Sequence, residues 1–354
     1  MVGLMQFVPA LLLTLPAGQL VDRVDRRGVL AAALILQAVV AAVLTWGSVH
    51  GWVDRNLIFG ASVLLGVARA LQWPSQQAIV PALVPAEQLP RAYAMSSTLN
   101  KVAVIGGPAL GGFIYAGGAA AYGACLALLI VSILQVASIQ RIPVAHSTEG
   151  VSFASLFAGV GFIWRKKAVL GAISLDLFAV LLGGATALLP MYAKDILQTG
   201  PWGLGLLRSA PAAGALIVGI LLARTPLARH VGRRMFIAVA VYGIAIVVFG
   251  LSRDFVLSLV ALAVSGGADM VSVVIRQTLV QLDTPDDMRG RVAAVNGTFI
   301  GASNELGEFR AGTVGEWLGP VGAVIVGGVG TLVVAGLWIR WFPSLARRDR
   351  LLSA

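Results

Sequence analysis

The sequence predicts an all-α membrane protein made of two tandem helix bundles. Of its 354 residues, 58% are hydrophobic and 12% are charged, and the mean hydropathy is +0.88. Soluble domains carry roughly twice that share of charged residues. The apolar residues gather in runs that approach the ~20 residues a helix needs to cross the hydrocarbon core of a bilayer. The second half of the chain also repeats features of the first, which predicts two similar bundles.

Each apolar run is predicted to form one membrane-spanning helix. The breaks between the runs carry glycine, proline and charge, which is typical of helix ends. In chain order the eleven runs lie at about 3–20, 28–49, 56–80, 92–115, 119–140, 168–190, 203–223, 234–251, 255–282, 291–316 and 319–342.

The distribution of basic residues predicts the orientation of the chain. A net charge of +10 would by itself suit a nucleic-acid-binding protein, but the basic residues lie in short loops between apolar runs. If the turn at 18–27 is cytoplasmic, the loops and the C-terminal end on that side hold eighteen Lys and Arg residues, against three on the opposite side. Cytoplasmic loops carry such an excess. We therefore expect a cytoplasmic C-terminus and, with eleven spans, a first residue outside the cytoplasm.

An internal repeat relates the two halves of the chain. Several positions recur at a constant offset of 200, and parallel repeats of this kind are used by membrane carriers. The recurring residues are Gln77, Pro85 and Arg91, which reappear as Gln277, Pro285 and Arg291.

The repeat predicts three parts: an N-terminal bundle over 1–140, a cytoplasmic linker over 141–167 and a C-terminal bundle over 168–354. Apolar residues at helical spacing within the linker predict a short helix in the inner membrane surface. Under the offset of 200, the span at 168–190 has its partner before residue 1. We therefore expect the first helix of the N-terminal bundle to be missing.

The first strongly polar stretch resembles the cytoplasmic signature loop of the major facilitator superfamily, which is a glycine, three residues, then Asp-Arg-x-Gly-Arg-Arg. Asp25 stands where that pattern usually has glycine. The resemblance implies a conformational latch in which Asp22 interacts with a positive helix N-terminus at the inner face. A basic loop between any two membrane helices is the alternative. The matching residues are Gly18, Asp22, Arg23, Arg26 and Arg27.

A second resemblance lies in the span at 56–80. Leu65, Arg69 and Gln72 follow the order Leu-x-x-x-Arg-x-x-Gln of another facilitator signature, in which the arginine is implicated in proton coupling. Trp73 replaces the glycine that follows in the family. A guanidinium within a membrane span is costly, so Arg69 should face a wet cavity or a carboxylate. The alternative is an arginine that snorkels or binds backbone carbonyls.

The span at 92–115 contains Gly107-Pro108-Ala109-Leu110-Gly111-Gly112. Proline kinks a helix, and glycines let a neighbouring helix approach closely. The segment resembles the core of the signature associated with antiporters, which implies an exporter driven by an inward proton flux. Generic close packing of helices is the alternative for Gly107, Pro108, Gly111 and Gly112.

Ionisable residues inside apolar spans are the candidate functional groups, because such residues are rare in membranes and usually line pathways. Carboxylates held away from bulk water can exchange protons near neutral pH. A structural ion pair is the alternative for each residue. The proton-coupling candidates are Arg69, Asp176, Asp269, Glu305 and Glu308, and the substrate-cavity candidates are Gln72, Trp73, Lys101, Arg208 and Arg310.

Four segments are similar, within the superfamily, to the enterobactin-exporter-like branch. The resemblance implies the major facilitator fold with about 11 of its usual 12 transmembrane helices, in a multi-pass protein of the bacterial inner membrane. It also implies export of a small molecule, with a siderophore such as enterobactin favoured, by proton antiport and alternating access. A multidrug or macrolide exporter and a transport-inactive, truncated membrane protein are the alternatives. The segments are 65–112, 204–211, 287–292 and 303–312.

Other classes of function find little support in the sequence. Its single cysteine, Cys125, and its three histidines, His50, His146 and His230, provide neither a disulfide framework nor metal-ligand spacing. It contains no P-loop motif and no evident pairing of a nucleophile with a base. We therefore expect no enzyme activity, no cofactor or metal and no nucleic-acid partner. The expected partners of a monomer are a small-molecule substrate, protons and the lipid bilayer.

Overall fold

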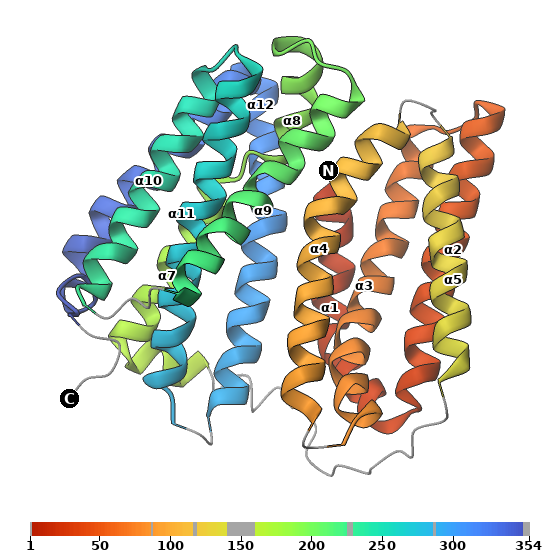
Figure 1. Cartoon of the computed structure of the whole chain (residues 1–354), viewed down its shortest axis with the longest axis horizontal. Coiled ribbons are helices and arrows are strands. Elements are labelled where there is room, and N and C mark those ends of the chain that lie inside the picture. The colour runs from red at the N-terminus through yellow and green to blue at the C-terminus, as the bar shows by residue number, and fades with distance from the viewer. Residues whose placement is uncertain are drawn as a thin grey trace. The chain divides into compact units, whose positions relative to one another are not determined.

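The computed structural model describes residues 2–85, 88–115, 119–139, 160–224, 229–285 and 288–349, and these residues form helices and the turns that connect them (Figure 1). Eight helices among them are long and apolar enough to cross a membrane. The predicted all-α membrane class is therefore confirmed. The chain divides into two compact units, residues 1–102 with 114–153 and residues 103–113 with 154–354.

The helices of the first half follow the apolar runs. Within the first unit α1 packs on α3, and α2 contacts both α3 and α5. The helices are α1 (Val2–Arg23), α2 (Arg26–His50), α3 (Arg55–Leu83), α4 (Leu89–Tyr115) and α5 (Ala120–Ser138).

The second unit contains a longer series of helices. Within it α9 packs on α11, α10 contacts α11 and α12, and α7 packs along α12. The elements are α7 (Lys167–Gly183), a 3₁₀ turn (Thr186–Leu188), α8 (Leu189–Met191), a π-helical turn (Tyr192–Ile196), α9 (Pro201–Arg224), α10 (Val231–Leu251), α11 (Phe255–Leu282), α12 (Arg289–Trp341) and α13 (Pro343–Ala346). Of the predicted linker, residues 160–165 are helical, and most of the remainder lies outside the described residues.

The sequence repeat reappears in how α3 and α11 begin. Asp54 precedes α3 and accepts a hydrogen bond from the Leu57 backbone N–H at 2.7 Å. Asp254 precedes α11 and accepts one from the Leu257 N–H at 2.7 Å. An aspartate at this position satisfies a backbone donor that the helix itself leaves without a partner. The offset of 200 therefore relates local structures as well as residue types.

Glycines at the same repeat position allow the closest helix crossings. A Cβ at Gly66 of α3 would collide with the backbone carbonyl of Gln6 in α1, and a Cβ at Gly266 of α11 would collide with that of Pro211 in α9. Without a side chain, the two backbones can approach within contact distance, which is how helices gain dispersion energy in lipid. Glycine is therefore required at 66 and 266 by packing rather than by backbone conformation.

A kink at Gly319 separates two helical stretches of α12. Gly319 has φ 73° and ψ 167°, a conformation that favours glycine, and Pro320 follows it inside the element. The kink falls at the first residue of the apolar run predicted at 319–342, just after the run predicted at 291–316. The two runs thus form consecutive helical stretches on either side of a turn.

The break after α7 is the feature that positions the candidate site. α7 ends at Gly183, and the next residue, Gly184, adopts an extended conformation before the 3₁₀ turn begins at Thr186. Glycine has a low helix propensity, so two in succession favour an interruption. The segment after the break is anchored by Tyr192, which is fully buried and donates its hydroxyl to the Gly250 carbonyl at 2.9 Å.

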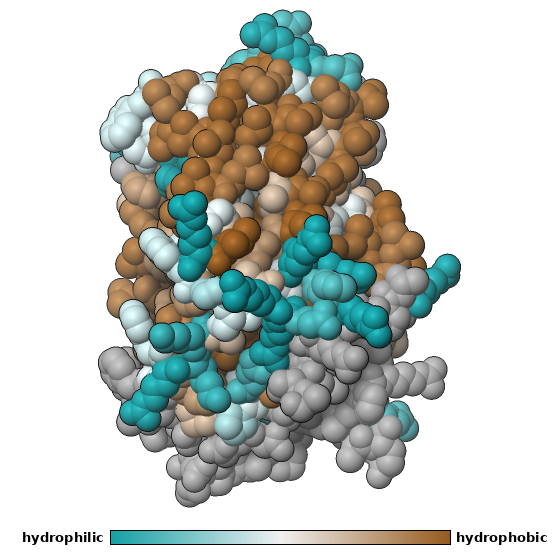
Figure 2. Space-filling view, turned by 90° about the vertical axis from the view of Figure 1, so that its left-hand side faces the viewer, coloured by the Kyte–Doolittle hydropathy of each residue, from teal (hydrophilic) through white to brown (hydrophobic). Residues whose placement is uncertain are grey.

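Large apolar side chains remain exposed along whole helices. Figure 2 shows hydrophobic residues covering much of one face of the molecule, with hydrophilic residues gathered mainly toward its lower part. Along α10 the exposed residues recur three or four positions apart, so they form one stripe on the helix surface. Such a stripe suits contact with lipid chains. Its members are Ile237, Val241, Ile244, Val248 and Leu251.

We predict that Gly266→Ala destabilises the protein by about 1–3 kcal/mol, because the added methyl group overpacks the crossing of α9 with α11. The measurement is the thermal unfolding midpoint in detergent micelles. Gly336→Ala is the matched control, because a Cβ at this exposed helical glycine meets no atom within 4 Å among the described residues. Equal midpoints for the two variants would contradict the assigned role of Gly266.

Candidate functional site

A buried ion pair joins α7 to α11. Asp176 Oδ1 contacts Arg276 Nη1, and the two residues are 8% and 2% exposed. Both side chains are withdrawn from the surroundings, so each charge would be costly to bury without a partner. The pair therefore fixes which faces of α7 and α11 meet.

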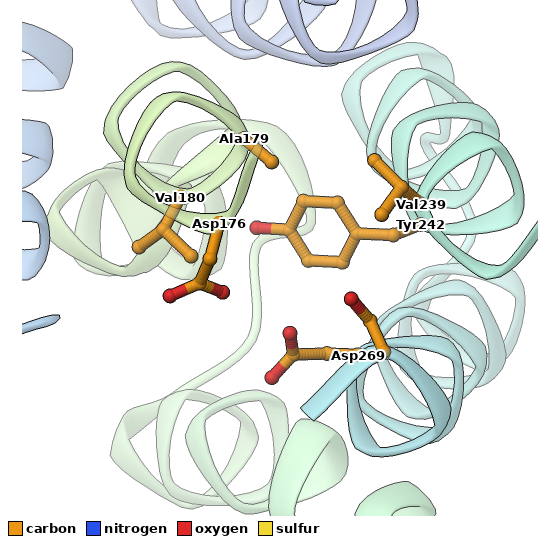
Figure 3. A pocket seen from close by; sticks show the side chains of 7 residues that line it. Asp176, Ala179, Val180, Val239, Tyr242 and Asp269 are labelled. Carbon is orange, nitrogen blue, oxygen red and sulfur yellow. The ribbon is translucent and has the colours of Figure 1, made fainter. Parts of the chain in front are cut away.

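A small pocket surrounds the carboxylate of Asp176. Its empty space is about 260 Å³, including the part open to the surroundings. Figure 3 shows Tyr242 extending from α10 toward α7, with the carboxylates of Asp176 and Asp269 on the same side of its ring in this view. Helices α7, α10 and α11 thus bring a phenol and two carboxylates to one place. The lining residues are Asp176, Ala179, Val180, Val239, Tyr242, Asp269 and Ser272.

The charges of this cluster do not balance when both acids are ionised. The carboxylates of Asp176 and Asp269 repel each other, and Arg276 attracts both. Two carboxylates against one guanidinium leave one negative charge in apolar surroundings, and a single proton would neutralise it. The arrangement is therefore chemically suited to taking up and releasing one proton. Two predicted proton-coupling candidates, Asp176 and Asp269, are brought together here.

Arg310 lies on α12 and binds the end of α7. Its Nε donates to the Leu181 carbonyl at 3.0 Å, and its Nη2 donates to the Leu182 carbonyl. These carbonyls belong to the last turn before the break, where a helix lacks intrahelical donors. Arg310 thus stabilises the broken end of α7.

The candidates on α3 share one region of that helix. Arg69 and Trp73 are exposed, and because they are four positions apart they lie on the same face. Gln72 is half-buried and accepts a hydrogen bond from Gln37 of α2 at 2.7 Å. The role predicted for these residues in coupling or substrate binding stays a prediction.

The remaining polar candidates lie on other helices. Glu305 and Glu308 are half-buried on α12, and Arg208 is exposed on α9. Lys101 belongs to α4, but its side chain lies outside the described part of the structure. None of these is among the residues that line the pocket around Asp176.

The predicted latch is described only in part. Gly18, Asp22 and Arg23 belong to α1, but their side chains lie outside the described residues, whereas Arg26 and Arg27 begin α2. Arg27 donates its Nε to the Val136 carbonyl at 3.1 Å and its Nη2 to the Ala137 carbonyl, both at the end of α5. A cation is favourable at a helix C-terminus. The latch function stays a prediction.

Asp25, which stands where the family pattern usually has glycine, has a local structural role. Its carboxylate accepts a hydrogen bond from the Arg27 backbone N–H at 3.1 Å, so it serves as the N-cap of α2. Aspartate is among the preferred residues there.

The proline-glycine motif lies within α4, where Pro108 is inside the helix. A Cβ at Gly107 or Gly111 would meet no atom within 4 Å among the described residues, whereas Gly112 is buried. In the described part of the chain, no neighbouring helix therefore packs closely against Gly107 or Gly111.

Sequence inspection did not single out Tyr242 or Ser272. Tyr242 is the one polar side chain between Met235 and Leu251, and it precedes Gly243, which packs against α12. A lone hydroxyl in an apolar span was therefore an available signal. Ser272 is a small residue that is common in apolar helices, so no comparable signal marks it.

Comparison with known sequences gives a family match and several relatives. A profile of the family described as transmembrane secretion effector matches residues 1–349. The chain is 26% identical over 272 residues to the enterobactin exporter EntS of Shigella boydii and to that of Escherichia coli. The aligned region covers 76% of this chain and 65% of each relative, so the chain spans less than two thirds of their length.

Solved transporter structures share the fold. A mutant of the nucleoside transporter NupG superposes with a TM-score of 0.74, covering 96% of this chain and 90% of that chain at 14% identity. A POT family transporter in complex with a thioalcohol-conjugated peptide gives a TM-score of 0.73, covering 96% and 86% at 12% identity. At such identities the likeness shows the fold alone.

We predict that Arg276→Gln destabilises the protein by about 3–5 kcal/mol, because it leaves the buried carboxylates without their cation, and that Asp176→Asn destabilises it less, because Asp269 remains to compensate Arg276. The double variant should recover much of the loss. The measurement is a double-mutant cycle on thermal or denaturant unfolding in detergent. Additive effects of the two changes would show that the pair contributes no coupling.

Proposed function

Because the chain belongs to the transmembrane secretion effector family of the major facilitator superfamily, we propose that it exports a small molecule by proton antiport with alternating access. The family and the fold make it a membrane transporter of the facilitator type. Proton coupling and the chemical class of the substrate are the proposed parts.

The observation that carries the proposal is the presence of Asp176 and Asp269 in one pocket, with Arg276 in contact with Asp176. A purely structural ion pair needs one carboxylate, and the second adds repulsion inside an apolar bundle. Such unfavourable electrostatic repulsion is typical of groups that bind an ion or a proton during a transport cycle. Arg276 Nε has no hydrogen-bond partner among the described residues, so the guanidinium has donor capacity beyond its contact with Asp176.

The size of this pocket favours a proton over an organic substrate. The space in which the centre of a water molecule fits is about 10 Å³, which is roughly what a single water needs and far too little for an organic molecule. We therefore assign the cluster to coupling and place substrate recognition on other residues.

A siderophore of the catecholate type is the substrate we favour. The guanidinium of Arg69 and the indole of Trp73 lie on one exposed face of α3. A guanidinium suits anionic oxygens, and an indole suits an aromatic ring. The similarity to the enterobactin exporters supports the same class.

Export of lipophilic cations, as by a multidrug or macrolide exporter, is the alternative. Glu305 and Glu308 favour it, because they lie half-buried one helical turn apart on α12 and could attract a cationic drug. The two substrate classes therefore depend on different residues of the chain.

We propose a monomer in the bacterial inner membrane with its C-terminus in the cytoplasm. Exposed arginines beside the start of α10 and after α13, among them Arg229, Arg233 and Arg347, support this orientation. Asp22 would contribute to the cytoplasmic latch in this arrangement.

Two variants should separate the substrate classes. Arg69→Ala should abolish most efflux of enterobactin from cells or vesicles and should not change the efflux of ethidium from that of the unaltered protein. Glu308→Gln should affect only ethidium. Arg253→Ala, which removes an exposed arginine between α10 and α11, is the matched control. Loss of ethidium efflux in Glu308→Gln, with no enterobactin transport by the unaltered protein, would establish the multidrug alternative.

Asp269→Asn should uncouple transport from the proton gradient. In proteoliposomes the variant should retain exchange of enterobactin between the two sides, because exchange needs no net proton movement, and should lose the stimulation by an imposed pH gradient. Asp195→Asn, a change at an exposed aspartate of the π-helical turn, should behave as the unaltered protein. Full stimulation in Asp269→Asn would exclude this residue as a proton carrier.

A further inference from the structure

The break in α7 is maintained by side chains from a neighbouring helix. Arg310 of α12 donates to the carbonyls of Leu181 and Leu182, the last ones before Gly183. A Cβ at Gly327 of the same element would lie 3.1 Å from Arg310 Nη2, so a glycine there leaves space for the guanidinium. Arg310 Nη1 is buried and has no hydrogen-bond partner among the described residues.

Tyr242 contacts the backbone at the same break. A Cβ built at Gly183 would lie 2.5 Å from Tyr242 Cε1 and 3.1 Å from its hydroxyl oxygen. It would also lie 2.7 Å from Thr331 Oγ1, which itself donates to the Ala179 carbonyl of α7 at 3.1 Å. The phenol thus rests against the last residue of α7, and glycine at 183 is what makes room for it.

The same side chain lines the pocket that holds the carboxylates. Tyr242 reaches that pocket from α10, as Figure 3 shows. Charged groups from the surrounding helices act on it: Asp176 from α7, Asp269 from α11 and Arg310 from α12. Arg276 of α11 completes the cluster through its contact with Asp176. Tyr242 is therefore shared by the carboxylate cluster and the α7 break.

A phenol hydroxyl can serve these neighbours in two ways, because it donates one hydrogen bond and also accepts. It can donate to an ionised carboxylate, or it can accept from a guanidinium N–H such as Arg310 Nη1. Uptake of a proton by the carboxylate cluster weakens the first interaction and so favours the second. The hydroxyl then accepts a hydrogen bond from Arg310, the guanidinium that stabilises the end of α7.

We propose that Tyr242 is a positioning residue that transmits the protonation of the Asp176–Asp269 cluster to the break after Gly183. In this proposal, proton uptake loosens the hold of Arg310 on α7, and the segment beyond the break, including α8, changes its exposure. The inference rests on the proposed proton coupling and adds the route by which coupling reaches a helix that can bend. A two-state element biased by a ligand is the physical requirement for such transmission.

A single-cysteine reporter tests the route without requiring the substrate. Cys125→Ser removes the exposed native thiol, and Met191→Cys introduces one on α8, where Met191 is 41% exposed. The protein in nanodiscs is treated with a maleimide at mildly acidic and mildly alkaline pH, and the labelling rate is corrected with a free thiol. We expect the corrected rate to depend on pH, and Tyr242→Phe to remove that dependence.

The variants are matched so that a loss of structure is recognised. Tyr242→Phe keeps the ring and removes only the hydroxyl, and Tyr122→Phe, on α5, is the control change. Thermal unfolding of both variants should stay close to that of the parent. Tyr122→Phe should preserve the pH dependence of labelling.

The outcomes separate this inference from the proposed function. If Asp269→Asn removes the pH dependence and Tyr242→Phe retains it, the route through Tyr242 is wrong and proton binding by the cluster stands. If the parent shows no pH dependence, or Asp269→Asn leaves it unchanged, the route is overturned, and the stimulation of transport by a pH gradient decides separately whether the cluster carries protons. Loss of the dependence in both variants supports the route.

Discussion

In a helix bundle surrounded by hydrocarbon, a charged side chain is stable only where another group compensates its charge. The contact of Asp176 with Arg276 meets this requirement at the centre of the second unit, where both residues are buried. It fixes the facing sides of α7 and α11, and with them the positions of the other residues in the pocket. Asp269 then adds a second carboxylate, whose negative charge the single guanidinium of Arg276 cannot also neutralise. The same constraint therefore explains both the rigidity of the pair and the capacity of the site to bind a proton.

Close helix packing makes such a cluster possible, because polar groups can compensate one another only at short range. Gly266 lets α11 approach α9, and Gly183 leaves room for the ring of Tyr242 at the end of α7. Arg310 and Arg27 have a common role on different helices: each guanidinium binds two successive carbonyls at a helix end. The carbonyls that Arg310 binds lie at the break after α7, inside an apolar stretch where water is scarce. There the guanidinium stabilises an interruption that would otherwise be unfavourable.

The fold could be predicted largely from the sequence, because the length of an apolar run and the repeat at an offset of 200 are both visible in one chain. Asp176 and Asp269 could be found for a similar reason, since an acid stands out in an apolar run. Their arrangement could not be found. The partner of Asp176 lies 100 residues away on α11, and only the tertiary packing brings it there. The partners of Arg310 could not be predicted either, because every residue has a backbone carbonyl and the sequence does not show which ones need a donor. Gly183-Gly184 did indicate a place where a helix could end.

The location of the cluster relative to the α7 break bears on how a proton could move a helix. Neutralisation of a buried charge changes the forces on its neighbours, and packed helices shift between discrete arrangements rather than deforming gradually. A continuous helix would resist such a change along its whole length. α7 instead ends within contact of Tyr242, and the next segment is anchored separately through Tyr192 to Gly250. The free energy of one protonation event is small. It can therefore move a helix most easily where the backbone already lacks its regular hydrogen bonds. The pairing of a titratable cluster with a broken helix is thus a physically economical arrangement for a transporter driven by protons.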